Sequence, residues 1–128
     1  MSHDPGSTTA RGLAIEARVA AWLEARGFSI EDRNVECGGV ELDIVAREPG
    51  GTRRVFFEVR SRSSDERGHP LETINAAKRR RLVRGATAWL VERSLWEKVE
   101  VRFDVIAVLA SDPHGPLQIE HVRDAYWA

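Results

Sequence analysis

The pattern of hydrophobic and polar positions predicts two helices and four or five strands. Apolar residues recur every three or four positions in Arg11–Arg26 and Pro70–Arg93, the period of an amphipathic helix. Short apolar or alternating segments, typical of strands, lie between and after the helices. They are Phe28–Val35, Val40–Arg47, Arg54–Arg62, Glu100–Leu109 and, as an optional last strand, Leu117–Val122. This order predicts an α/β fold with a mixed sheet flanked by helices.

Length and composition predict a single domain. The chain has 128 residues, of which 42% are hydrophobic. Residues 1–10 mix Pro, Gly, Ser and Thr without periodicity, so we expect a disordered tail followed by one domain over residues 11–128. No apolar run reaches the ~18 residues of a membrane span, and the first residues lack the order of a signal peptide. We therefore expect a cytoplasmic protein with no membrane partner.

The net charge of −1 conceals a basic middle segment. Residues 53–102 hold 13 basic and 7 acidic side chains, whereas both flanking segments are acidic. Five basic residues crowd the start of the second expected helix: Lys78, Arg79, Arg80, Arg81 and Arg84. This density is suited to phosphate contacts. A solvated helix face is the alternative interpretation, so a polyanionic partner needs further support.

The two strands around Gly50-Gly51 carry the chemically informative pattern. A two-residue turn there would pair Asp43 with Glu58 and Glu41 with Arg60. Since strand side chains alternate between faces, these four charges would share one face. The opposite face would point into a core and carry Leu42, Ile44, Phe57 and Val59.

Two opposed carboxylates need compensation. At about 5 Å and an effective dielectric of about 20, Asp43 and Glu58 would repel each other by roughly 3 kcal/mol. A cation, a shared proton or a neighbouring base would relieve this repulsion, and Mg²⁺ prefers carboxylate oxygens. A metal ion is the simplest answer. An exposed sheet face with a Glu41–Arg60 ion pair is the alternative.

A third acid lies on the first expected helix. Glu16 interrupts the apolar stripe that should pack against the sheet, and a buried acid without a partner is costly. Glu16 therefore either joins the two strand carboxylates or reaches solvent at the edge of the stripe.

Four blocks of the sequence resemble a known family. They are 38–46 (GGVELDIVA), 56–62 (FFEVRSR), 78–82 (KRRRL) and 102–106 (RFDVI). Together with Glu16, they resemble the YraN-like family of small, poorly characterised bacterial proteins in the PD-(D/E)XK nuclease superfamily. That family is similar to archaeal Holliday-junction resolvases. The resemblance extends from about Arg11 to the C-terminus.

The resemblance implies an αβββαβ restriction-endonuclease-like core and metal-dependent cleavage of DNA, in branched or damaged regions. Mg²⁺ or Mn²⁺ would be held by Asp43, Glu58 and the Val59 carbonyl. Glu16 would orient water or complete the metal shell, and Lys78 would help to position phosphate. Because junction resolvases cut two strands symmetrically, the resemblance also makes a homodimer an expectation.

Two departures from the family pattern leave a second hypothesis open. The superfamily usually has lysine where this chain has Arg60, and arginine effectively cannot lose its proton. Arg60 could hold the attacking water or stabilise the transition state, but it could not act as a general base. Val40 also falls between Gly39 and Glu41, where the family often continues directly to the acid. The alternatives are a nuclease-fold module that binds nucleic acid without turnover, and a protein-interaction domain.

Tryptophan offers a further route to nucleic acid, because aromatic rings can stack on unpaired bases. Trp22 and Trp89 lie at helical spacing with other apolar residues, which predicts core packing. Trp96 and Trp127 stay open as stacking candidates.

Overall fold

The structure, a computed structural model, describes the backbone of residues 5–62, 74–109 and 115–126, and the side chains of residues 13–61, 74–109 and 115–126. Two helices and five strands make up this part of the chain. In order they are α1 (Pro5–Ala25), β1 (Ser29–Cys37), β2 (Val40–Arg47), β3 (Arg54–Arg62), α2 (Ala76–Glu92), β4 (Val101–Leu109) and β5 (Gln118–Tyr126).

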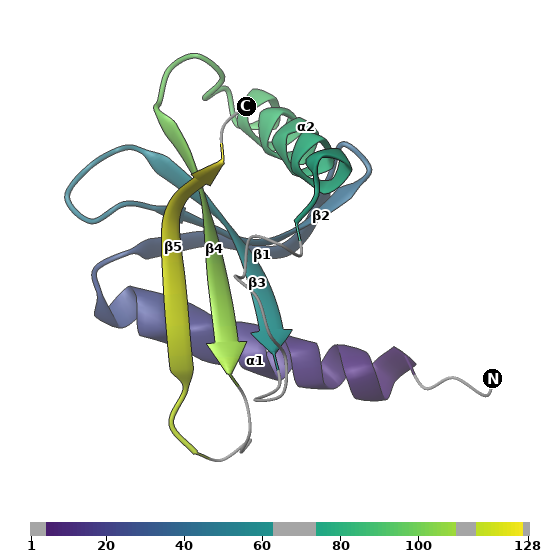
Figure 1. Ribbon diagram of the computed structural model, residues 1–128. Coiled ribbons are helices and arrows are strands. Elements are labelled where there is room, and N and C mark those ends of the chain that lie inside the picture. The colour runs from purple at the N-terminus through teal and green to yellow at the C-terminus, as the bar shows by residue number, and fades with distance from the viewer. Residues whose placement is uncertain (1–4, 63–73, 110–114, 127–128) are drawn as a thin grey trace.

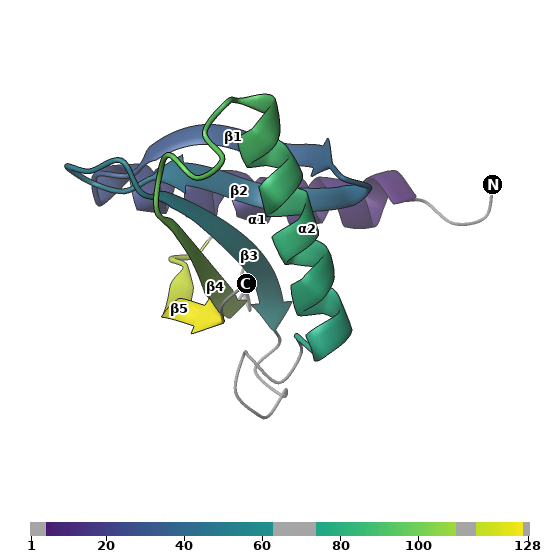
Figure 2. The ribbon, with the colours of Figure 1, turned by 90° about the horizontal axis from the view of Figure 1, so that it is seen from above.

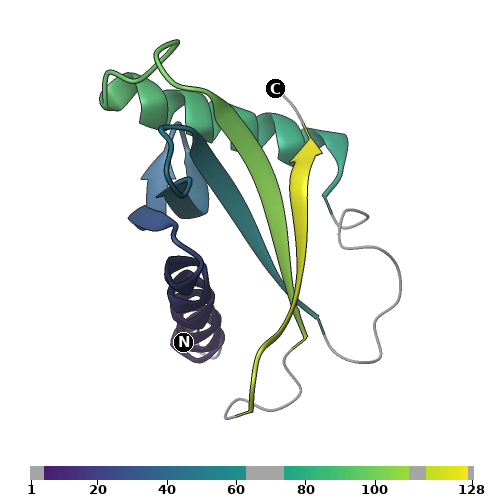
Figure 3. The same cartoon turned by 90° about the vertical axis from the view of Figure 1, so that its left-hand side faces the viewer.

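The strands form one mixed sheet in the order β1-β2-β3-β4-β5 (Figure 1). β3 and β4 are parallel, and the other neighbours are antiparallel. A parallel pair needs a crossover connection, which α2 supplies. The helices lie on opposite faces of the sheet (Figure 2). Seen from the side, the sheet twists strongly from β1 to β5 (Figure 3). The expected mixed sheet with flanking helices is confirmed.

The face under α2 holds an aromatic core. Trp89 of α2 is buried and meets Phe56 edge-on, at 5.6 Å between ring centroids. Gly85 brings α2 close to the start of β2, since a Cβ at this position would lie 3.1 Å from Val40 Cβ and 3.2 Å from the Cys37 carbonyl oxygen. This close approach holds the middle of α2 beside the turn between β1 and β2.

The face under α1 holds a second, more aliphatic core. Val19 and Leu23 of α1 pack with Ile44, Phe57 and other buried residues of the sheet. One expectation is wrong here: Leu42 packs with the α2-side core rather than beside Ile44. Its neighbour Asp43 leaves the regular strand pairing, as described below, so the simple alternation of faces does not hold at this end of β2.

The element boundaries show where sequence pattern is informative. β2 and β3 have the predicted bounds. The expected tail over residues 1–10 is wrong for residues 5–10, because α1 begins at Pro5. Proline is favoured at the first helical position, because an N–H there would have no hydrogen-bond acceptor within the helix. β5 runs to Tyr126, four residues past its expected end at Val122.

α2 also begins later than its apolar period predicted. Asn75 is its N-cap, with a side chain that accepts a 2.9 Å hydrogen bond from the Lys78 N–H. This cap starts the helix at Ala76 rather than at Pro70. Residues 70–73 of the expected helix and Trp127, a stacking candidate, lie outside the described residues. Within the described residues, neither helix is long and apolar enough to cross a membrane.

Candidate functional site

The register of the central hairpin is the one that the sequence predicted. Ile44 pairs with Phe57, and Arg47 pairs with Arg54. The expected backbone pairs Asp43–Glu58 and Glu41–Arg60 do not form, because the paired stretch ends at Ile44. The turn itself is longer than the expected Gly50-Gly51 pair, since the Glu48 N–H donates to the Arg53 carbonyl at 3.0 Å and encloses residues 49–52. Because both turns centre on the same residues, the difference leaves the strand register unchanged.

The hairpin opens at the point where the two acids lie. Pairing between β2 and β3 ends at Ile44, although β2 stays paired with β1 as far as Val40. Just beyond this point, Asp43 Oδ2 accepts a 2.9 Å hydrogen bond from the Val59 N–H. The carboxyl group thus replaces a strand partner and satisfies a backbone donor that the separation of the strands would otherwise leave unpaired.

Three acids from three elements converge at this opening. Asp43 lies beside both Glu58 and Glu16 of α1. Burial, followed by the nearby charge of Glu58, raises the pKa of Asp43 to about 8. Burial also raises the pKa of Glu16. Oε1 of Glu16 is buried and has no hydrogen-bond partner among the described residues. Glu16 therefore lies beside the strand carboxylates with one oxygen buried, although its side chain as a whole is half-buried.

Two cations contact the most buried part of this cluster. The Glu58 side chain is 7% exposed, and its Oε2 lies 3.2 Å from Lys78 Nζ and 3.3 Å from Arg60 Nη1. Arg60 thus pairs with Glu58 and not, among the described contacts, with Glu41. Lys78 reaches the cluster from the first turn of α2, which the Asn75 cap and the close packing at Gly85 position. The ion pairs place two positive groups beside the three carboxyl groups.

A cavity of about 240 Å³ opens onto the cluster. Asp43, Glu58, Lys78 and Arg81 line it, together with Gly39 and neighbouring residues of β2. The small residue Gly39 has φ +76°, a left-handed conformation that glycine adopts readily, so the tight turn into β2 leaves this side of the cavity free of a side chain. Acidic and basic groups therefore face one open space.

The basic cluster of α2 is divided between this cavity and structural contacts. Lys78 and Arg81 line the cavity, and Arg80 and Arg81 are exposed. Arg79 Nε donates to the Ile74 carbonyl at 3.1 Å, and Arg84 Nε donates to the Gly38 carbonyl at 3.2 Å. The five residues do not form one uniform phosphate-binding face, and Arg81 is the exposed residue best placed to meet a ligand in the cavity.

The acidic cluster offers oxygen donors of the kind that a hard metal ion binds. Within the described side chains, no three His, Cys, Asp or Glu residues are already arranged as a metal site. The oxygens of Asp43 and Glu58 are nevertheless donors that Mg²⁺ prefers. The unpartnered Glu16 oxygen and the raised pKa of Asp43 indicate that the cluster has too little positive charge for its acids to ionise together. In chemical type these donors therefore suit a hard divalent cation, and ligation by the Val59 carbonyl stays a prediction.

Sequence reasoning missed two neighbours of the acids. Asn34 of β1 lies beside Glu16 and has φ +53°, which asparagine tolerates better than most residues. Tyr126 of β5 lies beside Asp43 and Glu58. No motif marks Asn34, and Tyr126 falls beyond the expected end of the last strand. Only the fold of the sheet brings them to the site.

The candidate site lies within a stretch that matches a known family. Residues 15–108, which include every candidate site residue, match the uncharacterised protein family UPF0102. A UPF0102 protein of Chromohalobacter salexigens is 38% identical over 126 residues, covering 98% of each chain. One from Anaeromyxobacter dehalogenans is 42% identical over 123 residues, covering 96% of this chain and 88% of the relative. A third, from Beutenbergia cavernae, is 46% identical over 107 residues, covering 83% and 87%. The chain therefore belongs to the UPF0102 family.

Proposed function

We propose that this protein is a divalent-metal-dependent DNA endonuclease that hydrolyses phosphodiester bonds. The observation that carries the proposal is the meeting of three acids, Glu16, Asp43 and Glu58, with the cations Lys78 and Arg60. Asp43, Glu58 and Lys78 also line one open cavity. The order of elements is αβββαβ followed by β5, with Asp43 and Glu58 on the central hairpin. This order is consistent with a restriction-endonuclease-like core of the PD-(D/E)XK type. Branched or damaged DNA is the proposed substrate class.

The side chains divide the reaction between them. A bound Mg²⁺ would polarise the scissile phosphate and lower the pKa of a coordinated water. Asp43 and Glu58 would hold the ion, and Glu16 would accept a hydrogen bond from the attacking water. Lys78, which is one-third exposed in the cavity, would attract the phosphate. Arg60 would stabilise negative charge in the transition state, because its guanidinium stays protonated and cannot act as a base.

The Glu58→Gln variant tests the proposal. Supercoiled plasmid, single-stranded DNA and a four-way junction are incubated with Mg²⁺, with Mn²⁺ or with EDTA. We expect cleavage only with a metal ion, and a loss of about 100-fold or more in the variant because a metal ligand is lost. Glu36→Gln removes an exposed carboxylate of β1 and should cleave like the parent protein. Cleavage that persists in EDTA, or in Glu58→Gln, would contradict the proposed site.

Replacement of Arg81 by glutamine should weaken binding to a similar extent for every DNA sequence. Arg81 is exposed and lines the cavity, so we expect it to contact a backbone phosphate. Loss of one such contact lowers the slope of log K against log[salt] by about 1. Fluorescence anisotropy with labelled DNA at several salt concentrations measures this slope. Arg47→Gln, an exposed arginine at the far end of β2, is the matched control and should leave the slope unchanged.

A binding module without turnover is the second candidate. It is favoured by the two cations that already contact Glu58 Oε2 and by the lack of a preformed three-ligand arrangement among the described residues. Salt-sensitive DNA binding without a metal-dependent product, on every DNA tested, would decide in favour of this candidate.

A further inference from the structure

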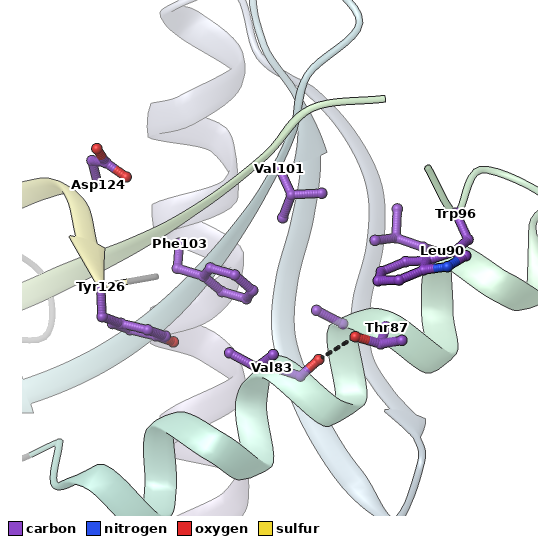
Figure 4. A pocket seen from close by; sticks show the side chains of 9 residues that line it. Val83, Thr87, Leu90, Trp96, Val101, Phe103, Asp124 and Tyr126 are labelled. Carbon is purple, nitrogen blue, oxygen red and sulfur yellow. Dashed lines mark hydrogen bonds between the residues drawn. The ribbon is translucent and has the colours of Figure 1, made fainter. Parts of the chain in front are cut away.

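A second cavity, largely apolar, lies between α2 and the strands β4 and β5. Its volume is about 380 Å³, within the roughly 300–1,000 Å³ typical of small-ligand sites. Figure 4 shows Phe103 and Tyr126 on one side of it and Trp96 on the other. The rings of Phe103 and Tyr126 are stacked, with centroids 5.1 Å apart, and Trp96 is 47% exposed. Aromatic surfaces thus face the cavity from two sides.

Tyr126 connects this cavity with the acidic site. It lines the apolar cavity and also borders Asp43 and Glu58. The guanidinium carbon of Arg79 lies 5.7 Å from the centre of its ring, so a positive group also stands at this boundary. The surroundings therefore change from charged to aromatic across a single side chain.

A ligand that fills both places must carry an anionic group and an aromatic ring side by side. A nucleotide has this construction, with phosphate and base joined through one sugar. An aliphatic chain would leave the charged groups unmatched, and a sugar alone would leave the aromatic walls unmatched. The structure thus favours a nucleotide unit over either alternative.

We propose that the apolar cavity holds an unstacked nucleobase of the DNA strand whose phosphate lies at the acidic site. This inference rests on the proposed function and names its substrate class: DNA with unpaired or extruded bases. A base inside a duplex cannot enter such a cavity unless it leaves the stack. The polar side chains of Thr87, Asp124 and Tyr126 line the cavity, and the Thr87 hydroxyl already donates to the Val83 carbonyl at 2.9 Å. Because most of the wall is apolar or aromatic, recognition would rely mainly on stacking, which tolerates different bases.

Binding of a single-stranded oligonucleotide with one 2-aminopurine base tests the proposal. The assay contains EDTA, so that binding is measured without metal-dependent cleavage. We expect the fluorescence of the base to be quenched on binding. We also expect an affinity about fivefold or more above that of the same strand with abasic sites, because stacking on an aromatic side chain contributes this much per base. A fully paired duplex should bind more weakly than the single strand.

Two variants test the cavity, one by removing part of its wall and the other by filling it. Trp96→Ala removes an exposed wall and should weaken binding of the single strand about fivefold or more, while leaving the abasic strand unaffected. Thr87→Phe should fill the cavity and abolish quenching, which keeps the test decisive if the first variant folds poorly. Val91→Ala is the control, since Val91 is an exposed apolar residue of the same helix that does not line the cavity.

Three results would overturn the inference. They are equal affinity for normal and abasic strands, unchanged quenching in both cavity variants, and binding of free deoxyadenosine monophosphate as tight as that of the strand. The last result would assign the cavity to a free nucleotide. The cleavage assay with Glu58→Gln separates the two proposals, because the cavity inference can fail while metal-dependent cleavage persists. If the proposed nuclease function is wrong, the parent protein cleaves no DNA, or the Glu58→Gln variant cleaves as fast as the parent protein.

Discussion

Replacing Asp43 with asparagine should stabilise the metal-free protein at pH 8 and abolish metal-dependent cleavage. Burial and the neighbouring Glu58 raise the pKa of Asp43 to about 8, so the folded protein holds a proton that the unfolded chain releases near pH 3.8. Between these two values the stability falls as the pH rises. Asparagine removes this penalty, keeps an oxygen for the Val59 N–H, and loses the anionic ligand.

Urea unfolding in EDTA at pH 5 and pH 8 measures the effect. When the pH rises from 5 to 8, the parent protein should lose roughly 1–3 kcal/mol more unfolding free energy than the variant. Added Mg²⁺ should raise the melting temperature of the parent and not that of the variant, since a ligand stabilises only the fold that binds it. Glu24→Gln, an exposed acid of α1, should behave like the parent in both assays. If the variant is less stable than the parent protein at pH 8, ionised Asp43 does not destabilise the folded state, and the expectation is wrong.

Replacing Asp104 with asparagine should cost about 3–5 kcal/mol of stability. Asp104 on β4 is fully buried, yet its carboxylate lies 2.8 and 2.9 Å from the guanidinium of Arg102 and 2.7 Å from His121 Nε2. The Asp124 N–H donates to it at 3.0 Å. Removing the charge leaves Arg102 partly buried beside a neutral group. Because β5 carries His121 and Asp124, the loss should loosen β5 from the sheet.

The stability difference between Asp104→Asn and the parent protein should depend on pH. Burial alone would raise the pKa of Asp104, but the hydrogen bonds from His121, Arg102 and the Asp124 backbone together hold it below its ordinary value of 3.8. The contribution of Asp104 is therefore present above pH 3.8 and is lost as the pH falls through its lowered value. Urea unfolding at pH 7 and pH 3 tests this expectation.

Glu100→Gln provides the matched control for a charge removed from an ion pair. Glu100 lies 3.2 Å from Arg53, but its side chain is 82% exposed, so water replaces the lost contact. Its stability should change little at either pH. If Asp104→Asn is no more destabilising than Glu100→Gln, the buried network does not hold β5 in place.

Asp43 and Asp104 show that the pKa values of two acids in one sheet can be shifted in opposite directions. Asp104 receives a guanidinium, an imidazole and a backbone N–H, and its pKa is lowered. Asp43 receives one backbone N–H beside two further acids, and its pKa is raised. The network around Asp104 is complete, whereas the cluster around Asp43 has, among the described residues, three acids and only two cations, both of which contact Glu58. This difference supports a structural role for Asp104 and a ligand-binding role for Asp43.

The sequence alone determined the strand pair that carries the acids. Turn residues at Pro49-Gly50-Gly51 and the alternation on either side predicted β2, β3 and their register, because both signals are local. The acidic candidates Glu16, Asp43 and Glu58 also followed from local pattern, since each interrupts an apolar segment. Local pattern could not predict the face of Leu42, which depends on the separation of β2 from β3 beyond Ile44.

Only the tertiary structure decided what surrounds these acids. Lys78 reaches Glu58 across the crossover between β3 and β4, Asn34 reaches Glu16 from the edge strand, and Tyr126 comes from the far edge of the sheet. Each contact joins residues that are distant along the chain, and such contacts depend on how helices and strands pack rather than on any periodicity. The tertiary structure therefore determines which groups contact each charged side chain, whereas the sequence alone determines where the charged residues lie along each element.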